Sequence, residues 1–217
     1  MLPAAGETLS SPAAAPGSSR PNQTERRART RAALLAATAQ NISRYGYADM
    51  VVERVASDAG YTRGALYHLF SNKEELVLAT VEWVREAWTD EVGFLLDESD
   101  PVGTLIAVAR AFAVYSRHDP ARVLTRLRTE FAGTDHPVGK AVNEAREGFS
   151  EVVSRLITTG RTTGAIPPGT PVDMVAIAYM GAIDGIVNQL EGQAPFDSLF
   201  AERVTIGVLG LPPALGM

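Results

Sequence analysis

The sequence predicts an all-α protein in which a three-helix N-terminal domain precedes a larger helical domain. Apolar residues recur at helical spacing from about residue 24 onward, and no run alternates apolar and polar residues as a strand would. Prolines and glycines separate the helical stretches from one another. With 217 residues, 46% of them hydrophobic, the chain is long enough to bury a sizeable core.

The N-terminus combines a disordered arm with a cluster of arginines. Residues 1–24 are rich in Ala, Pro, Ser and Gly, so they contain too few large apolar groups to offset the entropy of ordering. The cluster that follows could lie along DNA phosphates or enter a minor groove, or it could simply keep the start of a helix soluble. Its members are Arg20, Arg26, Arg27, Arg29 and Arg31.

Four helices are predicted in the first part of the chain. The first runs from about residue 25 to 45 and ends at Gly46, and the second is short and ends at Gly60. Met50 and Val51 open the second helix without a capping side chain, although Asp49 could cap it. The third helix runs from an N-cap at Thr62 to about residue 70. A capping box formed by Ser71 and Glu74 opens a fourth helix that reaches about residue 97.

The rest of the chain is predicted to form five further helices. Proline and glycine signals, including a proline at or near the start of most of these segments, separate them. Their expected ranges are 101–118, 120–132, 138–160, 172–191 and 196–209.

The charge distribution favours a nucleic-acid partner for the N-terminal part. Residues 1–73 carry nine basic and five acidic side chains, whereas the remainder carries 11 basic and 20 acidic ones. A basic first third joined to an acidic remainder suggests that the first part meets a polyanion, because affinity depends on the local face presented to phosphates. Chance asymmetry between two solvated surfaces is the alternative explanation.

Composition excludes several other functions. The absence of cysteine excludes disulfides, thiolate metal sites and cysteine nucleophiles. We expect a cytoplasmic protein without membrane spans, because no apolar run is long enough for one and no secretory signal opens the chain.

The second and third predicted helices have the features of a DNA-binding helix-turn-helix at about residues 51–70. Leu66, Leu69 and Phe70 form a stripe to be buried, which leaves another side of the helix for DNA. Arg63 is the expected base contact, because its planar fork can bond the O6 and N7 of guanine. Gly64 and Ala65 are small enough for close approach to the groove. Phosphate contacts are expected from Tyr67, His68 and Lys73, and Thr62 is expected to fix the start of the helix.

This region resembles the N-terminal domain of the tetracycline-repressor (TetR) family over about residues 27–87. The resemblance is carried by GYA at 46–48, VERVA at 52–56 and AGYTRGALYHLFSNKEEL at 59–76. It implies a DNA-binding domain at 25–73, a ligand-binding and dimerisation domain at 74–217, and a homodimer. It also implies repression relieved by a small-molecule effector at a palindromic double-stranded operator. The family positions that touch DNA correspond to Thr62, Arg63, Gly64, Tyr67, His68 and Lys73.

The sequence departs from the family pattern at two positions. Met50 and Val51 stand where the family commonly has Ser or Thr, and Leu69 stands where it often has His. The phosphate contacts that those residues would make are therefore in question, whereas the apolar frame of the motif is intact.

The C-terminal part is expected to supply the ligand site and the dimer contact. Aromatic or polar residues that interrupt apolar helical stretches are candidates for the ligand site, although such aromatic residues more often belong to plain core. The last two helices are strongly apolar, which suits a two-fold four-helix interface, with burial inside one chain as the alternative. The ligand candidates are Phe94, Tyr115, Arg126, Glu130, Phe131, Tyr179, Asp184 and Asn188.

Rival functions have weaker support. An enzyme lacks an evident reacting constellation, so we expect no catalytic residues and no cofactor. The pairs His118-Asp119 and Asp135-His136 each precede a proline, which indicates turns more than a metal site. The remaining alternatives are an activator, a ligand-independent regulator of the same fold, and a helical protein-interaction module that does not bind DNA.

Overall fold

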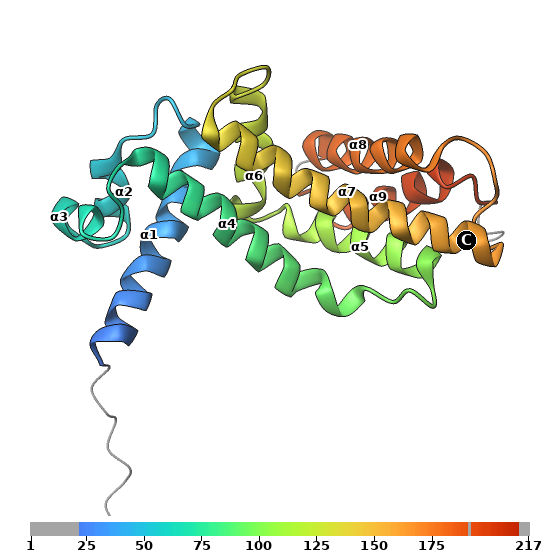
Figure 1. The fold of residues 1–217 in the computed structure, drawn as a ribbon, viewed down its shortest axis with the longest axis horizontal. Helices are drawn as coiled ribbons and strands as arrows, with labels where there is room; N and C mark the ends of the chain where they lie inside the picture. The colour runs from blue at the N-terminus through green and yellow to red at the C-terminus, as the bar shows by residue number, and fades with distance from the viewer. Residues whose placement is uncertain (1–21, 191, 213–217) are drawn as a thin grey trace, which may run out of the picture.

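The computed structural model describes residues 22–190 and 192–212, and within these ranges every regular element is a helix (Figure 1). The predicted all-α class is therefore confirmed. Residues 1–21, which include most of the predicted N-terminal arm and Arg20, lie outside the described residues. The elements are α1 Gln23–Tyr45, α2 Val52–Asp58, α3 Arg63–Tyr67, α4 Lys73–Val92, the short 3-10 helix η1 Gly93–Leu95, α5 Pro101–Tyr115, α6 Asp119–Glu130, α7 Pro137–Thr163, α8 Val172–Leu190 and α9 Phe196–Val208.

Side-chain caps fix the starts of α1 and α4. The side chain of Asn22 accepts a hydrogen bond from the backbone N–H of Glu25, whose carboxylate accepts one from the N–H of Asn22. At α4 the predicted capping box at Ser71 and Glu74 is wrong by one residue. Asn72 is the cap, at 2.8 Å from the N–H of Glu75, and the Glu75 carboxylate accepts from the N–H of Ser71. Asn is as good a cap as Ser, so the sequence alone did not distinguish the two registers.

The helix-turn-helix begins without a side-chain cap. Val51 occupies the N-cap position of α2 and no side chain caps it, so the expectation for Asp49 is wrong. Gly60 has a φ of 75°, which supplies the left-handed turn predicted between the two helices. The Thr62 hydroxyl accepts from the N–H of Ala65 at 3.2 Å, as predicted. Helix α3 nevertheless ends at Tyr67, three residues earlier than expected, because the chain then turns toward the start of α4.

Two apolar cores run along the molecule. The first core packs α1, α2, α3 and α4 together. It includes Leu66 and Phe70 of the predicted buried stripe, whereas Leu69 is only partly buried against it. The same core takes up Val123 and Leu127 of α6, so it continues from the N-terminal helices into the helical body. The second core joins α5, α7, α8 and α9. The helices of the helix-turn-helix are therefore packed on a core that continues into the rest of the protein.

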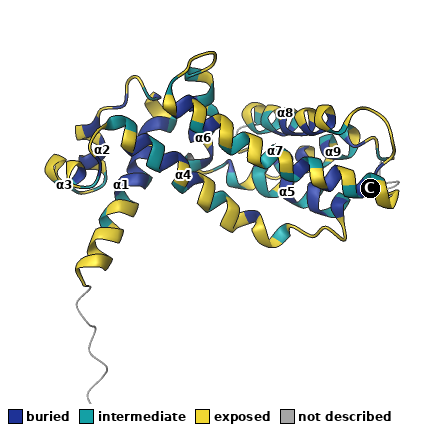
Figure 2. Cartoon of the chain, viewed as in Figure 1, coloured by how far each residue is buried: buried dark blue, intermediate teal, exposed yellow. Residues whose placement is uncertain are grey.

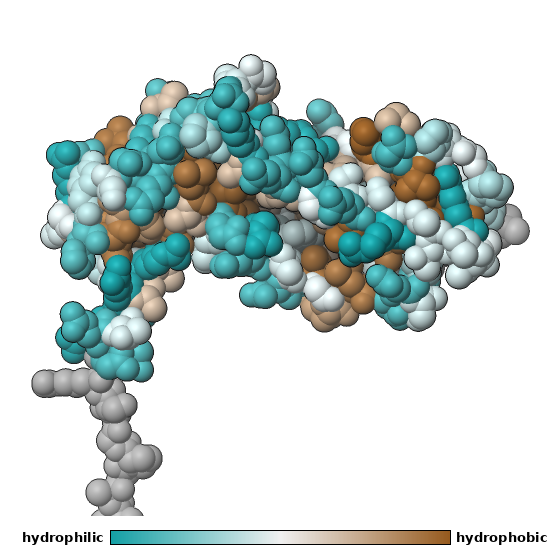
Figure 3. All heavy atoms as spheres, in the orientation of Figure 1, coloured by the Kyte–Doolittle hydropathy of each residue, from teal (hydrophilic) through white to brown (hydrophobic). Residues whose placement is uncertain are grey.

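The exposed surfaces lie at both ends of the elongated molecule. The N-terminal half of α1 protrudes from the body, is exposed and is mostly hydrophilic, whereas its C-terminal half is buried against α6 (Figures 2 and 3). At the other end, α8 and α9 keep large apolar side chains exposed. Met174 and Ile177 are 47% and 56% exposed on α8, and Phe196, Leu199 and Phe200 are exposed on α9.

Candidate DNA-binding surface and ligand cavity

Helix α3 presents the side chains that the sequence assigns to DNA. Arg63, Gly64, Tyr67 and His68 are exposed, and Ala65 is half-buried between them and the core. The Arg63 guanidinium lies 5.3 Å from the centre of the Tyr67 ring. Its Nη1 is 2.9 Å from a carboxylate oxygen of Glu53 on α2, with both side chains well exposed. This ion pair orients the Arg63 side chain, but solvent screening keeps its contribution to stability small.

Lys73 supports the loop between α1 and α2 in this structure. Its Nζ donates to the carbonyl of Ala48 at 3.2 Å and lies 4.7 Å from the centre of the Tyr47 ring. Partial burial lowers the pKa of Lys73, and the nearby carboxylates of Glu130 and Asp49 oppose that shift. The ammonium group therefore has a structural partner in addition to the phosphate contact predicted for it.

The described arginines of the predicted cluster extend the basic surface along the protruding half of α1. Arg26, Arg27, Arg29 and Arg31 are exposed on this helix. The Arg31 guanidinium lies 5.8 Å from the centre of the Phe70 ring, which places this arginine beside the end of the helix-turn-helix. The positive groups of α1 and α3 thus belong to one end of the molecule.

Glu130, the last residue of α6, connects that helix to the loop between α1 and α2. Its two carboxylate oxygens accept hydrogen bonds from the backbone N–H groups of Tyr47 and Ala48, each at 2.6 Å. Gly46 precedes them with φ 78° and ψ −179°, a conformation open essentially only to glycine. A Cβ atom at Gly46 would lie 2.8 Å from Oε2 of Glu130. Glu130 was expected only as a ligand residue, and the sequence does not indicate this structural role because the partners of Glu130 are 82 and 83 residues away.

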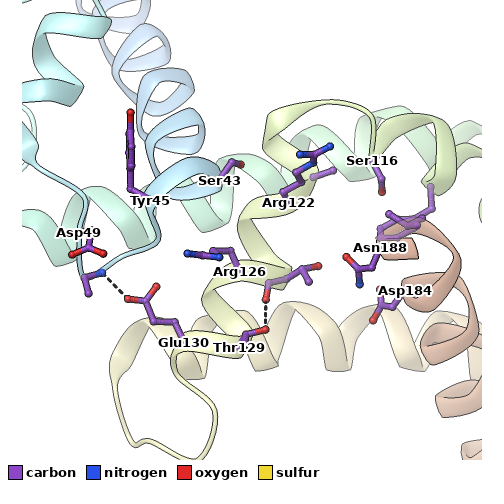
Figure 4. A pocket seen from close by; sticks show the side chains of 15 residues that line it. Ser43, Tyr45, Asp49, Ser116, Arg122, Arg126, Thr129, Glu130, Asp184 and Asn188 are labelled. Carbon is purple, nitrogen blue, oxygen red and sulfur yellow. Dashed lines mark hydrogen bonds between the residues drawn. The ribbon is translucent and has the colours of Figure 1, made fainter. Parts of the chain in front are cut away.

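An open hollow of about 580 Å³, lined by both polar and apolar groups, lies where the end of α1 faces α6 and α8 (Figure 4). Glu130 and Asp49 border it on the side of the α1–α2 loop, and Asp184 and Asn188 border it from α8. Arg126 of α6 is exposed beside Glu130. Four of the ligand candidates, Arg126, Glu130, Asp184 and Asn188, therefore line this hollow.

A smaller, mainly apolar cavity of about 120 Å³ lies inside the helical body. Trp88 of α4 meets Phe112 and Tyr115 of α5 and Phe149 of α7, with ring centres 5.2 to 6.2 Å apart. The charged side chains on its wall, among the described residues, are Arg85, Arg128, Arg146 and Asp184.

The remaining ligand candidates fall into two groups. Tyr115 lines the smaller cavity, together with Asp184 of the hollow. Phe94, Phe131 and Tyr179 line neither. Phe94 is 80% exposed, and Phe131 stacks on His136 in the first core. Tyr179 is fully buried, donates its hydroxyl to the carbonyl of Leu105 at 2.7 Å, and has its pKa raised by burial. Phe131 and Tyr179 are thus core residues.

The described residues hold no group of three or more His, Asp or Glu side chains that could bind a metal ion. The two histidine-containing pairs from the sequence lie at helix starts, where His118 and His136 are the N-cap residues of α6 and α7. No helix in the described part of the chain is long and apolar enough to cross a membrane.

Comparison with known proteins assigns the helix-turn-helix region to a described family. Residues 34–80 match the model of the bacterial regulatory proteins of the tetR family. The HTH-type transcriptional repressor BepR of Brucella suis biovar 1 (strain 1330) is 25% identical over 179 residues, which cover 78% of this chain and 85% of that protein.

Solved structures share the fold over most of the chain. A TetR transcriptional regulator from Chloroflexus aurantiacus superposes with a TM-score of 0.72 at 21% identity, covering 85% of this chain and 94% of that one. AibR in complex with isovaleryl coenzyme A and operator DNA superposes with a TM-score of 0.64 at 19% identity, covering 83% and 96%. At these identities the structural likeness concerns the fold.

Proposed function

This chain belongs to the TetR family of bacterial regulatory proteins, and we propose that it is a dimeric repressor released from a palindromic operator by a small molecule. The observation that carries the proposal is α3, a capped and packed helix on which Arg63 and Tyr67 are exposed, with exposed His68 at its end. This helix lies inside the segment that matches the family model.

Arg63 is the residue to which we assign base contact. A guanidinium group has five N–H donors, so the contact with Glu53 leaves donors for the O6 and N7 of a guanine. The Tyr67 ring beneath the guanidinium limits its rotation, which lowers the entropy lost on binding. Gly64 and Ala65 carry small side chains where the helix must approach the base edges.

The surrounding polar groups suit the DNA backbone. Tyr67 and His68 are exposed at the end of α3, and Thr62 fixes its start. Lys73 would reach a phosphate by sharing or leaving its bond to Ala48. Phosphate contacts of this kind fix the register of the protein on the duplex without specifying sequence.

We assign dimerisation to the exposed apolar face of α8 and α9. On α8, Met174 and Ile177 are exposed in line with Gly181 and Gly185, whose lack of side chains permits a partner helix to approach closely. The exposed phenylalanines of α9 extend the same apolar end of the molecule. Two copies joined here would form a four-helix interface and place two copies of α3 on successive major grooves, about 34–36 Å apart.

Release of DNA by a ligand requires that a conformational change in the helical body be transmitted to α3. A path for this change exists from the cavity beside α6 to Glu130 at the end of that helix, which accepts two hydrogen bonds from the α1–α2 loop. A ligand acts only through a difference in its affinity for two arrangements of the protein. A shift of α6 in the ligand-bound arrangement would displace the loop that leads into α2.

Selection of bound sequences from random DNA by the purified full chain tests this function. We expect an inverted repeat with half-sites about one helical turn apart, and repression of a reporter that carries it. In Arg63→Ala, discrimination at one base pair of each half-site should fall by about 1–3 kcal/mol. Arg110→Ala, which removes an exposed arginine of α5, is the matched control.

Several outcomes would count against the proposal. Binding without sequence preference would argue for a module that does not recognise DNA sequence, and a single isolated half-site would argue against the dimer. Unaltered specificity in Arg63→Ala would remove Arg63 from base contact. Reporter activation in place of repression would reverse the proposed sign of regulation.

A further inference from the structure

The small cavity inside the body has the size of one aromatic ring. Its volume is about 120 Å³, and an apolar cavity of roughly 150 Å³ is known to admit benzene. It lies between α4, α5, α6, α7 and α8, so one ligand would contact helices from both cores. Its wall also continues into the open hollow through Phe112, Thr125 and Asp184, which leaves room for a chain attached to the ring.

The aromatic side chains make the cavity suited to a flat apolar group. Trp88 stands nearly perpendicular to both Phe112 and Phe149, with interplanar angles of 87° and 78°. Edge-to-face packing of this kind presents ring faces and ring edges to the space between them. A ring entering the cavity would therefore find partners of either geometry.

The charged side chains on the wall favour an anion. Arg146 lies 3.0 Å and Arg128 3.4 Å from the same oxygen of Asp184, so two guanidinium groups share one carboxylate. The third arginine of the wall, Arg85, pairs with Glu82 outside the cavity. The group formed by Arg128, Arg146 and Asp184 keeps one unit of positive charge. All three are partly shielded from water, which strengthens their effect on a bound anion.

We propose that this cavity binds an amphipathic organic acid, with an aryl-sized apolar group among the four aromatic rings and a carboxylate held by Arg128 and Arg146. The inference rests on the proposed function, because it names the chemical class of the releasing ligand. It identifies a role for two arginines on α6 and α7 that sequence analysis did not single out.

Tyr115 adds a second point of recognition. Its hydroxyl is buried and makes no hydrogen bond within the described residues, and burial together with the charge of Glu91 raises its pKa. The phenol therefore stays protonated at neutral pH and is a donor without an acceptor. An oxygen of the ligand that reached it would satisfy this donor.

Calorimetric titration of the full chain with 3-phenylpropionate and its neutral isostere 3-phenylpropanamide tests the inference. The two probes share the ring and differ in charge, so we expect the acid to bind at least about tenfold more tightly. Arg146→Gln and Arg128→Gln should each reduce that ratio toward one while leaving amide binding in place. Arg146→Lys should restore part of the preference, and Arg110→Gln should leave it unchanged.

Ala145→Leu tests where the ring binds. Ala145 lines the cavity from α7, and the added side chain would occupy the space assigned to the ring. We expect it to abolish binding of both probes while the circular dichroism spectrum and thermal midpoint stay close to those of the wild type. Retained binding of both probes in this variant would place the ring elsewhere and overturn the assignment.

The outcomes separate this inference from the proposed function. Equal affinity for acid and amide, a preference that survives both glutamine variants, or no binding of either probe at millimolar concentration would overturn the ligand class. If DNA selection still yields a palindrome in that case, the regulator stands and its ligand is of another class. If DNA selection fails while the acid preference follows Arg128 and Arg146, the cavity assignment stands and the regulatory role does not.

Discussion

Replacing Glu130 by glutamine should loosen the loop that joins α1 to α2. The carboxylate accepts two backbone hydrogen bonds, and an amide side chain offers one acceptor oxygen and one NH₂ group in its place. One of the two N–H groups would lose its bond and face another donor. The variant also removes a negative charge that stabilises the ammonium group of Lys73.

The expected loss of stability follows from these contacts. A hydrogen bond to a charged group contributes about 1.5–3 kcal/mol, and the lower end applies because water can reach the N–H of Ala48. For a chain of this size, about 1.5 kcal/mol lowers the thermal midpoint by about 3–6 °C. Operator affinity should fall as well, because α2 and α3 follow directly after the loop.

Thermal unfolding by circular dichroism, at a protein concentration that keeps the oligomeric state constant, measures the first effect. Fluorescence anisotropy with the selected operator measures the second. Glu147→Gln, which neutralises an exposed glutamate on α7, is the matched control. If Glu130→Gln and the control have the same midpoint and the same operator affinity, the hydrogen bonds between Glu130 and the loop contribute neither to stability nor to operator binding, which would refute the prediction.

Three further substitutions test other parts of the structure. Gly46→Ala should cost about 1–3 kcal/mol in urea unfolding, because alanine tolerates neither the φ of 78° nor the approach of Glu130; an unchanged midpoint would contradict this. Ile177→Glu should convert the dimer to a monomer in analytical ultracentrifugation without unfolding it, and a persistent dimer would place the interface elsewhere. Asp197→Asn should cost about 1.5–3 kcal/mol at pH 7, because Arg117 bonds both oxygens of this buried carboxylate. Arg117 lowers the pKa of Asp197 below 3.8, so the wild-type advantage should shrink as the pH falls from 4 to 3; a constant difference would refute the assignment.

Local signals explain which parts of the fold were predictable. Gly46 and Gly60 were expected to end helices, and both adopt the positive φ that only glycine accepts readily. Thr62 was expected to cap α3, and it does. Each depends on a few neighbouring residues, which is the range over which a single sequence carries physical information. The capping box of α4 was predicted one residue too early, at Ser71, because both Ser71 and Asn72 are residues that can cap a helix.

The site was less predictable wherever it depends on packing between distant segments. Glu130 bonds a loop more than 80 residues away, and Arg128 and Arg146 meet at Asp184 across three helices. No periodicity in one helix indicates such a meeting. Tyr179 shows the converse, since an aromatic residue with a polar group on an apolar helix looked available for a ligand and is buried with its hydroxyl satisfied.

Because α1 is one continuous helix, its exposed N-terminal half must move as a rigid rod whenever its buried half tilts. Its C-terminal half is fixed in the first core from Leu34 onward, and its free end carries Arg26, about 12 Å away along a helix that rises 1.5 Å per residue. A tilt of about 10° at Leu34 would therefore move the free end by about 2 Å. A contact between a guanidinium group and a phosphate is lost over that distance. A rearrangement too small to disturb the core could thus detach the arginines of α1 from DNA.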